Sequence, residues 1–140
     1  MNDFELLHND HALLSSQVVH VVALVKALEQ GTTSTASLFA ELARQMELLQ
    51  QQLREHFAFE EAQAFPQLRI ARPDMAPALE PLHQQHAIIL EAFEKLLTCV
   101  NSSEPDWNAA AVLSDTFKTA FSEHAALEAQ LFGKISGAQR

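Results

Sequence analysis

Residues 54–68, REHFAFEEAQAFPQL, contain the pattern that decides the fold of this chain. His56 and Glu60 are four residues apart in a segment that favours helix, so they lie one above the other on the same helix face. Going back from His56 in steps of three and four residues, this face carries Leu53, Leu49, Met46, Leu42 and Phe39. Such spacing is typical of a helix packed in a bundle. The sequence therefore places an imidazole and a carboxylate in the core, where an isolated carboxylate is very costly.

The composition limits the classes of function. The chain has 140 residues, 48% of them hydrophobic, and a formal net charge of −9 at pH 7. This length suits a single domain over residues 1–140, and the acidic balance argues against nucleic acid as a partner. No apolar run approaches the ~20 residues of a membrane span, and the N-terminus lacks a secretory pattern, so we expect no membrane association and a cytoplasmic location. Cys99 is the single cysteine, which excludes an internal disulfide.

Three further segments show helical spacing of their apolar residues. The expected helices are residues 3–29, a second from about 34 or 35 that bends or ends at Pro66, a third from about 75–79 to 100, and a fourth from about 106 to 135. Short connections rich in Gly, Ser, Thr, Asn or Pro separate them. Four helices of similar length joined in this way predict an all-α fold, an up-down-up-down four-helix bundle.

Each of these other helices also carries polar residues within its apolar seam. The first seam consists of Phe4, Leu7, His11, Leu14, Val18, Val21 or Val22, Val25 and Leu28. The third consists of Leu79, His83, His86, Leu90, Phe93, Leu97 and Val100. The fourth consists of Leu113, Phe117, Phe121, His124, Glu128, Leu131 and Ile135. Two other histidines fall outside the seams, because His8 lies at the edge of the first seam and His20 on the opposite face.

The bundle topology brings the polar seam residues to one level. Those of the first and third helices come early in the helix, and those of the second and fourth come late, so alternating helix directions carry all of them to the same end. Five imidazoles and two carboxylates form a poor hydrogen-bond network without a cation and a good ligand set for two metal ions. The candidate metal ligands are His11, His56, Glu60, His83, His86, His124 and Glu128.

The donor atoms indicate which metals fit. Nitrogen and oxygen donors without sulfur suit Fe, Mn or Zn and disfavour Cu(I) or an iron–sulfur cluster. Both carboxylates can bridge two ions, and solvent bridges with at least one open position would complete near-octahedral coordination. Some alternatives stay open: a proton-sharing His/Glu core without metal, His83 as a rim residue instead of a ligand, and Glu61 facing solvent or hydrogen-bonding a ligand from outside.

The same residues make the chain resemble the hemerythrin-like family, the HHE cation-binding domain, over nearly its whole length. The most specific matches are the HFxxEE motif with its following Pro (His56 to Pro66) and the HxxxE motif of the last helix (His124 to Glu128). The segments NDHALL and QQHAIIL match the first and third helices of the family. The resemblance implies two Fe ions with an oxo or hydroxo bridge, bridging carboxylates at Glu60 and Glu128, and terminal ligands at His11, His56, His86 and His124.

Two departures bear on the function that the resemblance implies. Oxygen-carrying hemerythrins have HxxxH in the third helix and HxxxxD in the last, whereas this chain has HxxH (His83, His86) and HxxxE. The subgroup with four His and two Glu leans toward redox or NO chemistry. We therefore expect a non-haem di-iron protein that binds or reacts with O2, NO or peroxide at an open iron position. An iron- or oxygen-responsive module without catalysis is the alternative, and whether the chain is an enzyme stays open.

Overall fold

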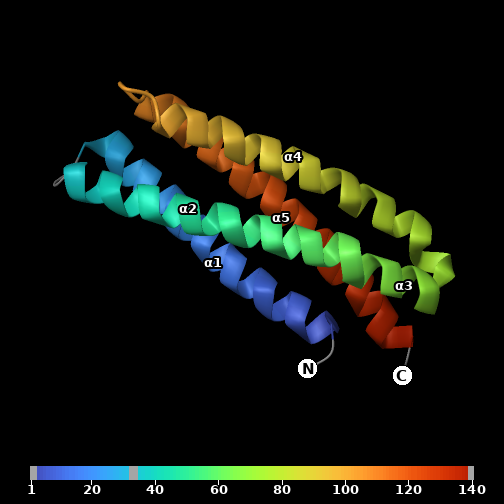
Figure 1. Cartoon of the computed structure of the whole chain (residues 1–140). Coiled ribbons are helices and arrows are strands. Elements are labelled where there is room, and N and C mark those ends of the chain that lie inside the picture. The colour runs from blue at the N-terminus through green and yellow to red at the C-terminus, as the bar shows by residue number, and fades with distance from the viewer. Residues whose placement is uncertain (1–2, 32–34, 139–140) are drawn as a thin grey trace.

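The computed structural model describes the backbone of residues 3–31 and 35–138 and the side chains of residues 10–31 and 35–134. The predicted side-chain positions of Phe4, Leu7, His8 and Ile135 lie outside this described part. The helical elements are α1 (Asp3–Gln30), α2 (Thr35–Phe59), the π-helical turn η1 (Glu60–Ala64), α3 (Phe65–Ala71), the 3₁₀ turn η2 (Pro73–Met75), α4 (Ala76–Val100) and α5 (Trp107–Ala138). They form a four-helix bundle in which α3 continues the line of α2, and this confirms the predicted fold (Figure 1).

The helices run alternately up and down, and the start of α1 and the end of α5 lie at the same end of the bundle as α3 (Figure 1). α1 gives way to the first connection at Gly31, whose φ of 66° is the left-handed conformation that glycine adopts without strain. At the other end of α2, the chain continues through η1 and α3, turns through η2 and enters α4 directly. The last part of α2 and the first part of α4 therefore meet at the α3 end.

The bend predicted at Pro66 takes the form of a π-helical turn instead of a break. A proline inside a helix lacks the N–H donor, and its ring clashes with the carbonyl one turn earlier. In η1 the N–H of Phe65 donates to the carbonyl oxygen of Glu60, five residues back, so one extra residue is accommodated before the proline. The turn begins at Glu60, which is buried, and the next residue, Glu61, is exposed. Two adjacent carboxylates thus differ in burial, and both contact His86 of α4, Glu60 at Nε2 and Glu61 at Nδ1.

A layer of polar side chains divides the core near the α3 end. The larger apolar cluster, which includes Leu14, Leu53, Ile89, Phe93 and Phe121, fills the bundle up to this layer. A smaller cluster lies beyond it and consists of Phe65, Leu68, Leu79, Leu82 and Leu131. The buried polar residues between the two clusters are His56, Glu60, His86, His124 and Glu128. Apolar packing on both sides therefore holds the polar layer away from bulk water.

The predicted seam of the third helix is partly wrong. The residues of α4 that are buried are Leu79, Leu82, His86, Ile89, Ala92, Phe93, Leu96 and Val100. His83 is exposed, and Leu90 and Leu97 are only half-buried. The physical reason is that steps of three and four residues can alternate in two ways on a helix, and both give an apolar stripe. The bundle axis lies on the side of Leu82 and Ile89.

Phe39 is a second correction to the predicted core. Its side chain is 38% exposed, although it continues the apolar seam of α2. Phe39 lies in the first turns of α2, beside the connection between the helices, and its ring meets Trp107 edge to face with centroids 6.2 Å apart. It therefore packs against the start of α5 at the far end of the bundle, away from the polar layer.

α1 contains one stretch, Asp10–Gln30, that is long and apolar enough to cross a membrane by length and composition, with a mean hydropathy of 1.5. This differs from the expectation that no apolar run approaches such a length. A helix that lines the core of a bundle passes the same test, and Leu14, Val18, Val21 and Val25 of this stretch are buried in the larger apolar cluster. The stretch is therefore weak evidence for a membrane span.

Candidate metal centre

The structure brings six of the seven predicted ligands together in the polar layer. They come from every long helix of the bundle and from the π-helical turn: His11 (α1), His56 (α2), Glu60 (η1), His86 (α4), and His124 and Glu128 (α5). Glu60 and Glu128 are fully buried, with side-chain exposures of 0%, and His11 is the most accessible of the set at 14%. Residues far apart in the sequence thus converge on one largely buried site, which we call the central cluster.

The central cluster consists of two overlapping ligand groups that share both carboxylates. The first is His11, His56, Glu60 and Glu128, and the second is Glu60, His86, His124 and Glu128. In each group one ligand atom per residue lies within 4.8 Å of the others. Each group is therefore small enough to surround one metal ion, and Glu60 and Glu128 stand between the two positions.

Glu128 has the arrangement expected of a bridging carboxylate. Its Oε2 lies 2.7 Å from Nε2 of His11, and its Oε1 lies 2.6 Å from Nε2 of His124. One oxygen thus faces each ligand group. Glu60 uses Oε1 toward both groups, at 3.4 Å from Nε2 of His56 and 3.0 Å from Nε2 of His86.

The outer nitrogens of three histidines are held by acceptors outside the central cluster. Nδ1 of His86 donates to Glu61 Oε1 at 2.9 Å, and Nδ1 of His124 donates to Gln85 Oε1 at 2.8 Å. Nδ1 of His56 lies 3.4 Å from Asp10 Oδ2. Because a carboxylate or amide oxygen can only accept, Nδ1 carries the hydrogen in the neutral rings. The inner Nε2 then presents a lone pair to the cluster, as in histidines that bind metal.

The buried polar atoms of the cluster lack hydrogen-bond partners, and this supports a cation. Five of these atoms lack a partner although a residue of opposite charge lies nearby: Nε2 of His11, His56 and His124, and both oxygens of Glu128. Oε2 of Glu60 is also unpaired. A buried donor or acceptor without a partner costs about 1–3 kcal/mol. Imidazole nitrogens and anionic oxygens that converge in this way fit one or two divalent cations once the nitrogens have lost their protons, so the residues present suit a metal site.

The charges in the cluster follow from burial and close contact. Burial opposes the charge of His124, but its contacts with Glu128 and Glu60 outweigh this effect and raise the pKa of His124 to about 9. Burial also opposes the charge of Glu128, but His11 and His124 hold the pKa of Glu128 far below its usual range. For His56 burial dominates and lowers the pKa. In the metal-free chain, the proton on His124 is thus the positive charge that faces Glu128.

This proton gives metal binding a defined pH dependence. The pKa of His124 in the folded chain, about 9, is above the ordinary value of 6.5, so the proton stabilises the metal-free fold below pH 6.5 and this contribution is lost as the pH rises through 9.

A metal ion that binds Nε2 of His124 must displace this proton. We expect about one proton to be released per chain on binding, and affinity to rise about tenfold per pH unit between these values. Titration calorimetry in buffers of different ionisation enthalpy measures the release; none at pH 7.5 would contradict this assignment.

Gln85 offers a test of the outer contacts. Changing Gln85 to Leu removes the acceptor that orients the His124 ring, and loss of such a partner weakens metal binding about 10–100-fold. The neighbouring Gln84→Leu is a matched control, since Gln84 is exposed and its amide contacts Glu80. Competition with a chromophoric chelator measures both affinities. Equal affinities of the two variants would show that the contact of Gln85 with His124 has no role in binding.

Two phenylalanine rings enclose His86. Phe57 stacks on the imidazole with centroids 4.0 Å apart, and Phe65 lies parallel to it with centroids 5.9 Å apart. Both phenylalanines are buried. They hold the ring in one plane and exclude water from that side of the cluster, so the aromatic residues near the site have a positioning role besides core packing.

His83 is the predicted ligand that the structure does not bring into the central cluster. Its side chain is 51% exposed, and its Nδ1 lies 3.1 Å from Glu61 Oε1. Glu61 in turn contacts His86 from outside, which is one of the two roles predicted for it. Sequence reasoning missed Asp10 and Gln85. Their only signal is a polar side chain directly before a site histidine, at His11 and His86.

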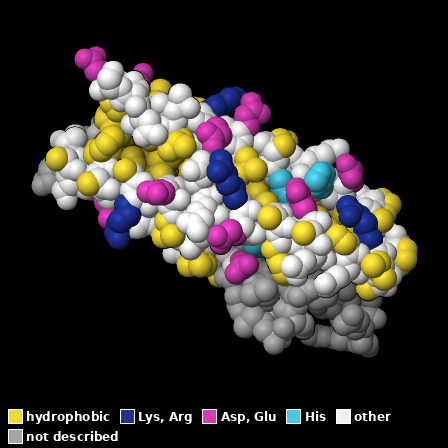
Figure 2. All heavy atoms as spheres, in the orientation of Figure 1, with side chains coloured by type: hydrophobic (Ala, Val, Ile, Leu, Met, Phe, Trp, Pro, Cys, Tyr) yellow, Lys and Arg dark blue, Asp and Glu magenta, His cyan; other side chains and the backbone are white. Residues whose placement is uncertain are grey.

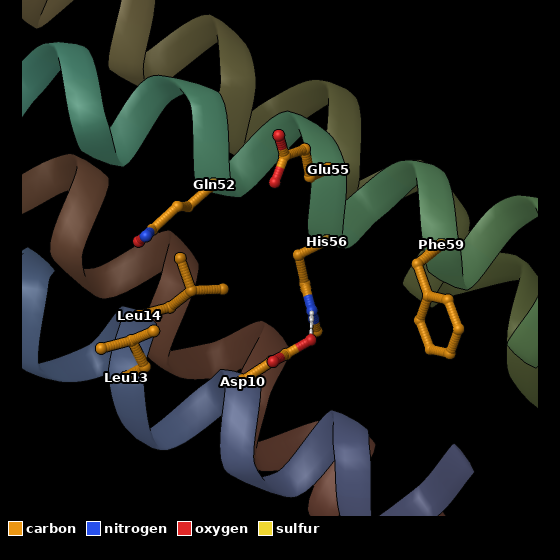
Figure 3. Close-up of a pocket in the computed structure, with 7 residues that line it drawn as sticks. All are labelled: Asp10, Leu13, Leu14, Gln52, Glu55, His56 and Phe59. Carbon is orange, nitrogen blue, oxygen red and sulfur yellow. Dashed lines mark hydrogen bonds and ion pairs between the residues drawn. The ribbon is translucent and has the colours of Figure 1, made fainter.

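A pocket opens between α1 and α2 on the outer side of His56 (Figure 3). Its volume is about 320 Å³, and its lining residues are Asp10, Leu13, Leu14, Gln52, Glu55, His56 and Phe59. Asp10 and the imidazole of His56 point toward each other across it (Figure 3). The pocket brings solvent to the back of one cluster histidine, while the inner Nε2 of that ring stays buried.

Fold and site together define a metal-binding four-helix bundle with a His/Glu centre. The family model for the hemerythrin HHE cation binding domain matches residues 2–135, nearly the whole chain. The chain belongs to this family, as its sequence motifs predicted. No match was found among curated protein sequences or among solved structures.

Proposed function

We propose that the central cluster holds two iron ions and that the protein binds or reacts with a small ligand, O2, NO or peroxide, at an open coordination position. The cluster offers imidazole nitrogen and carboxylate oxygen, which suit Fe and would also accept Mn or Zn. When bound, iron would supply the electrons for chemistry on such a ligand. The protein supplies geometry, charge and protection from water.

One observation carries the proposal: the two ligand groups share Glu60 and Glu128, and each contains four residues. Four protein ligands leave positions free around an ion that prefers six. With His83 outside the cluster, each group has two imidazoles and the two shared carboxylates. Each ion would therefore have open positions, and the exogenous ligand is placed next to His86 and His124 because of the residues around them.

The surrounding residues favour a small, weakly polar ligand at that position. Phe57 and Phe65 cover His86, and the smaller apolar cluster closes the end of the bundle beyond it. A dry site strengthens electrostatic contacts and restricts access to small molecules. Glu61 and Gln85 hold the two histidines with their Nε2 atoms inward, so the ring positions would persist while a ligand enters or leaves.

The experiment is anaerobic loading with Fe(II), followed by separate titrations with NO, O2 and peroxide, monitored by absorption. We expect a saturable spectral change with at least one of the three, and its reversal on removal of the ligand would distinguish binding from reaction. The chain loaded with Zn(II), which has no accessible redox change, is the control and should show none. A protein that retains two irons per chain and responds to none of these molecules would contradict the proposal.

A second candidate is an iron- or oxygen-responsive module without catalysis. This role is favoured by the origin of the ligands, which come from α1, α2, η1, α4 and α5. A bound metal would therefore link all four helical segments of the bundle. Metal binding would then act mainly through folding free energy. A chain that loses most of its helical circular dichroism on chelation would favour this role.

A further inference from the structure

A second group of metal-ligating side chains lies outside the central cluster, between η1 and α4. It consists of Glu61, His83 and His86, with one ligand atom of each within 4.8 Å of the others. Glu61 Oε1 is 3.1 Å from Nδ1 of His83 and 2.9 Å from Nδ1 of His86. Atoms bound to one tetrahedral ion at ~2.0–2.1 Å lie roughly 3.3 Å apart, so these spacings suit a single cation. We call this group the outer cluster.

The outer cluster is open to solvent. Glu61 and His83 are exposed, and they line a surface pocket of about 240 Å³ together with Phe65, Arg69 and Glu80. Histidine and acidic side chains lie next to each other on this face, between α4 and the rod formed by α2 and α3 (Figure 2). A hydrated cation can therefore reach Glu61 and His83 without any movement of the bundle.

His86 belongs to both clusters through its two nitrogens. Its Nδ1 faces Glu61, and its Nε2 lies 3.0 Å from Glu60 Oε1 in the central cluster. The ring itself is buried, between Phe57 and Phe65. Within the described part of the chain, the outer cluster thus joins a surface pocket to the central ligands through one imidazole.

From this arrangement we propose that the outer cluster is a loading site, which captures a divalent cation from solvent and passes it to the central cluster. The inference rests on the proposal that the central cluster holds metal. The chemical class is a borderline divalent ion that accepts both imidazole and carboxylate, such as Fe(II), Mn(II), Co(II) or Zn(II). His83 has its function here, as a ligand of the incoming ion, and this explains an exposed histidine within a motif that otherwise serves the centre.

The shared imidazole makes occupancy of the outer cluster transient. While Nδ1 of His86 binds the captured ion, the single ring hydrogen lies on Nε2, which donates it to Glu60 Oε1. When Nε2 binds a central ion instead, Nδ1 carries the hydrogen and donates it to Glu61, as in other metal-binding histidines. The outer cluster then keeps Glu61 and His83 but loses its third ligand. A captured ion is held less tightly once the centre is filled, so the outer cluster does not retain a third ion.

The test is the rate at which the metal-free chain takes up Co(II), followed by the absorption of the cobalt ion after rapid mixing. His83→Ala should slow the filling of the centre about tenfold, the lower end of the cost of removing a metal-positioning partner, with two ions still bound at the end. His20→Ala is the matched control, because His20 is an exposed histidine of α1, which contributes no residue to the outer cluster. His83 is exposed, so its replacement leaves the core intact.

Glu55→Gln tests the competing route through the pocket beside His56, which Glu55 lines. We expect wild-type loading rates for this variant. Uptake of two ions by His83→Ala at the wild-type rate would overturn the loading site and leave the central cluster standing. Slower loading of Glu55→Gln, with His83→Ala unchanged, would overturn it equally and assign uptake to the other pocket. Failure of the proposed function looks different, since the wild-type chain would then load two ions and not respond to O2, NO or peroxide.

Discussion

Glu60→Gln is expected to remove both metal ions from the chain at once. Glu60 belongs to both ligand groups, and its Oε1 lies within 3.4 Å of Nε2 of His56 and 3.0 Å of Nε2 of His86. Glutamine has nearly the same shape but no charge, so the two positions lose a shared anionic ligand together. We expect affinity to fall by at least about a hundredfold for each ion. Metal content after dialysis against a weak chelator measures the result.

His11→Ala is the matched comparison for this prediction. His11 belongs to only one of the two groups, so its loss should spare the ion held by His86 and His124. The metal-free Glu60→Gln chain should also be more stable than the metal-free wild type, because the substitution removes a buried charge and supplies an amide donor to unpaired imidazole nitrogens. A Glu60→Gln chain that is less stable than the wild type and binds as much metal would show that Glu60 has a structural role. It would contradict the proposal that Glu60 is a ligand shared by both ions.

Metal removal is expected to lower the thermal stability of the fold without abolishing its helices. Ligand free at about a thousand times its Kd stabilises the native state by about 4 kcal/mol. For a domain of this size that corresponds to roughly 10–20 °C in the unfolding midpoint. Metal removal also leaves two fully buried carboxylates, Glu60 and Glu128, without a cation beside them, and this lowers the stability of the fold further.

Helical content should survive metal removal because most of the bundle packs independently of the site. The larger apolar cluster joins residues of α1, α2, α4 and α5, and of these Phe57 also contacts the histidines of the polar layer. Circular dichroism during heating, with and without chelator, measures both quantities. The Glu60→Gln chain is the control, since its midpoint should not respond to metal. Equal midpoints for loaded and metal-free wild type would contradict the prediction.

The fold could be predicted from the sequence because the apolar spacing of each helix is regular. The spacing does not fix which side of a broad apolar stripe faces the bundle axis. For this reason His83, expected in the core, is exposed, and Leu82, which was not in the expected seam, is buried. The turn at Pro66 shows a similar limit. The missing N–H of proline predicts a disturbance of the helix, whereas the π-helical form depends on how α3 packs against the end of the bundle.

The central cluster could be predicted to nearly the same extent, since a polar residue within an apolar seam needs a partner at the same height. His11, His56, Glu60 and Glu128 were found in this way. The outer partners Asp10 and Gln85 could not, because each contacts a histidine of another helix, and such contacts depend on helix rotation and side-chain rotamers. The loading role of Glu61 and His83 likewise depends on contacts between η1 and α4.

The most direct test of this account is metal content per chain, measured together with the absorption spectrum before and after anaerobic reduction, on protein prepared without added metal and again after loading with Fe(II). The account predicts two irons per chain, absorption bands in air that bleach on reduction, and loss of both ions in Glu60→Gln. A folded chain that holds no metal as prepared, and takes up none on loading, would contradict the central claim that the six residues of the central cluster form a metal centre.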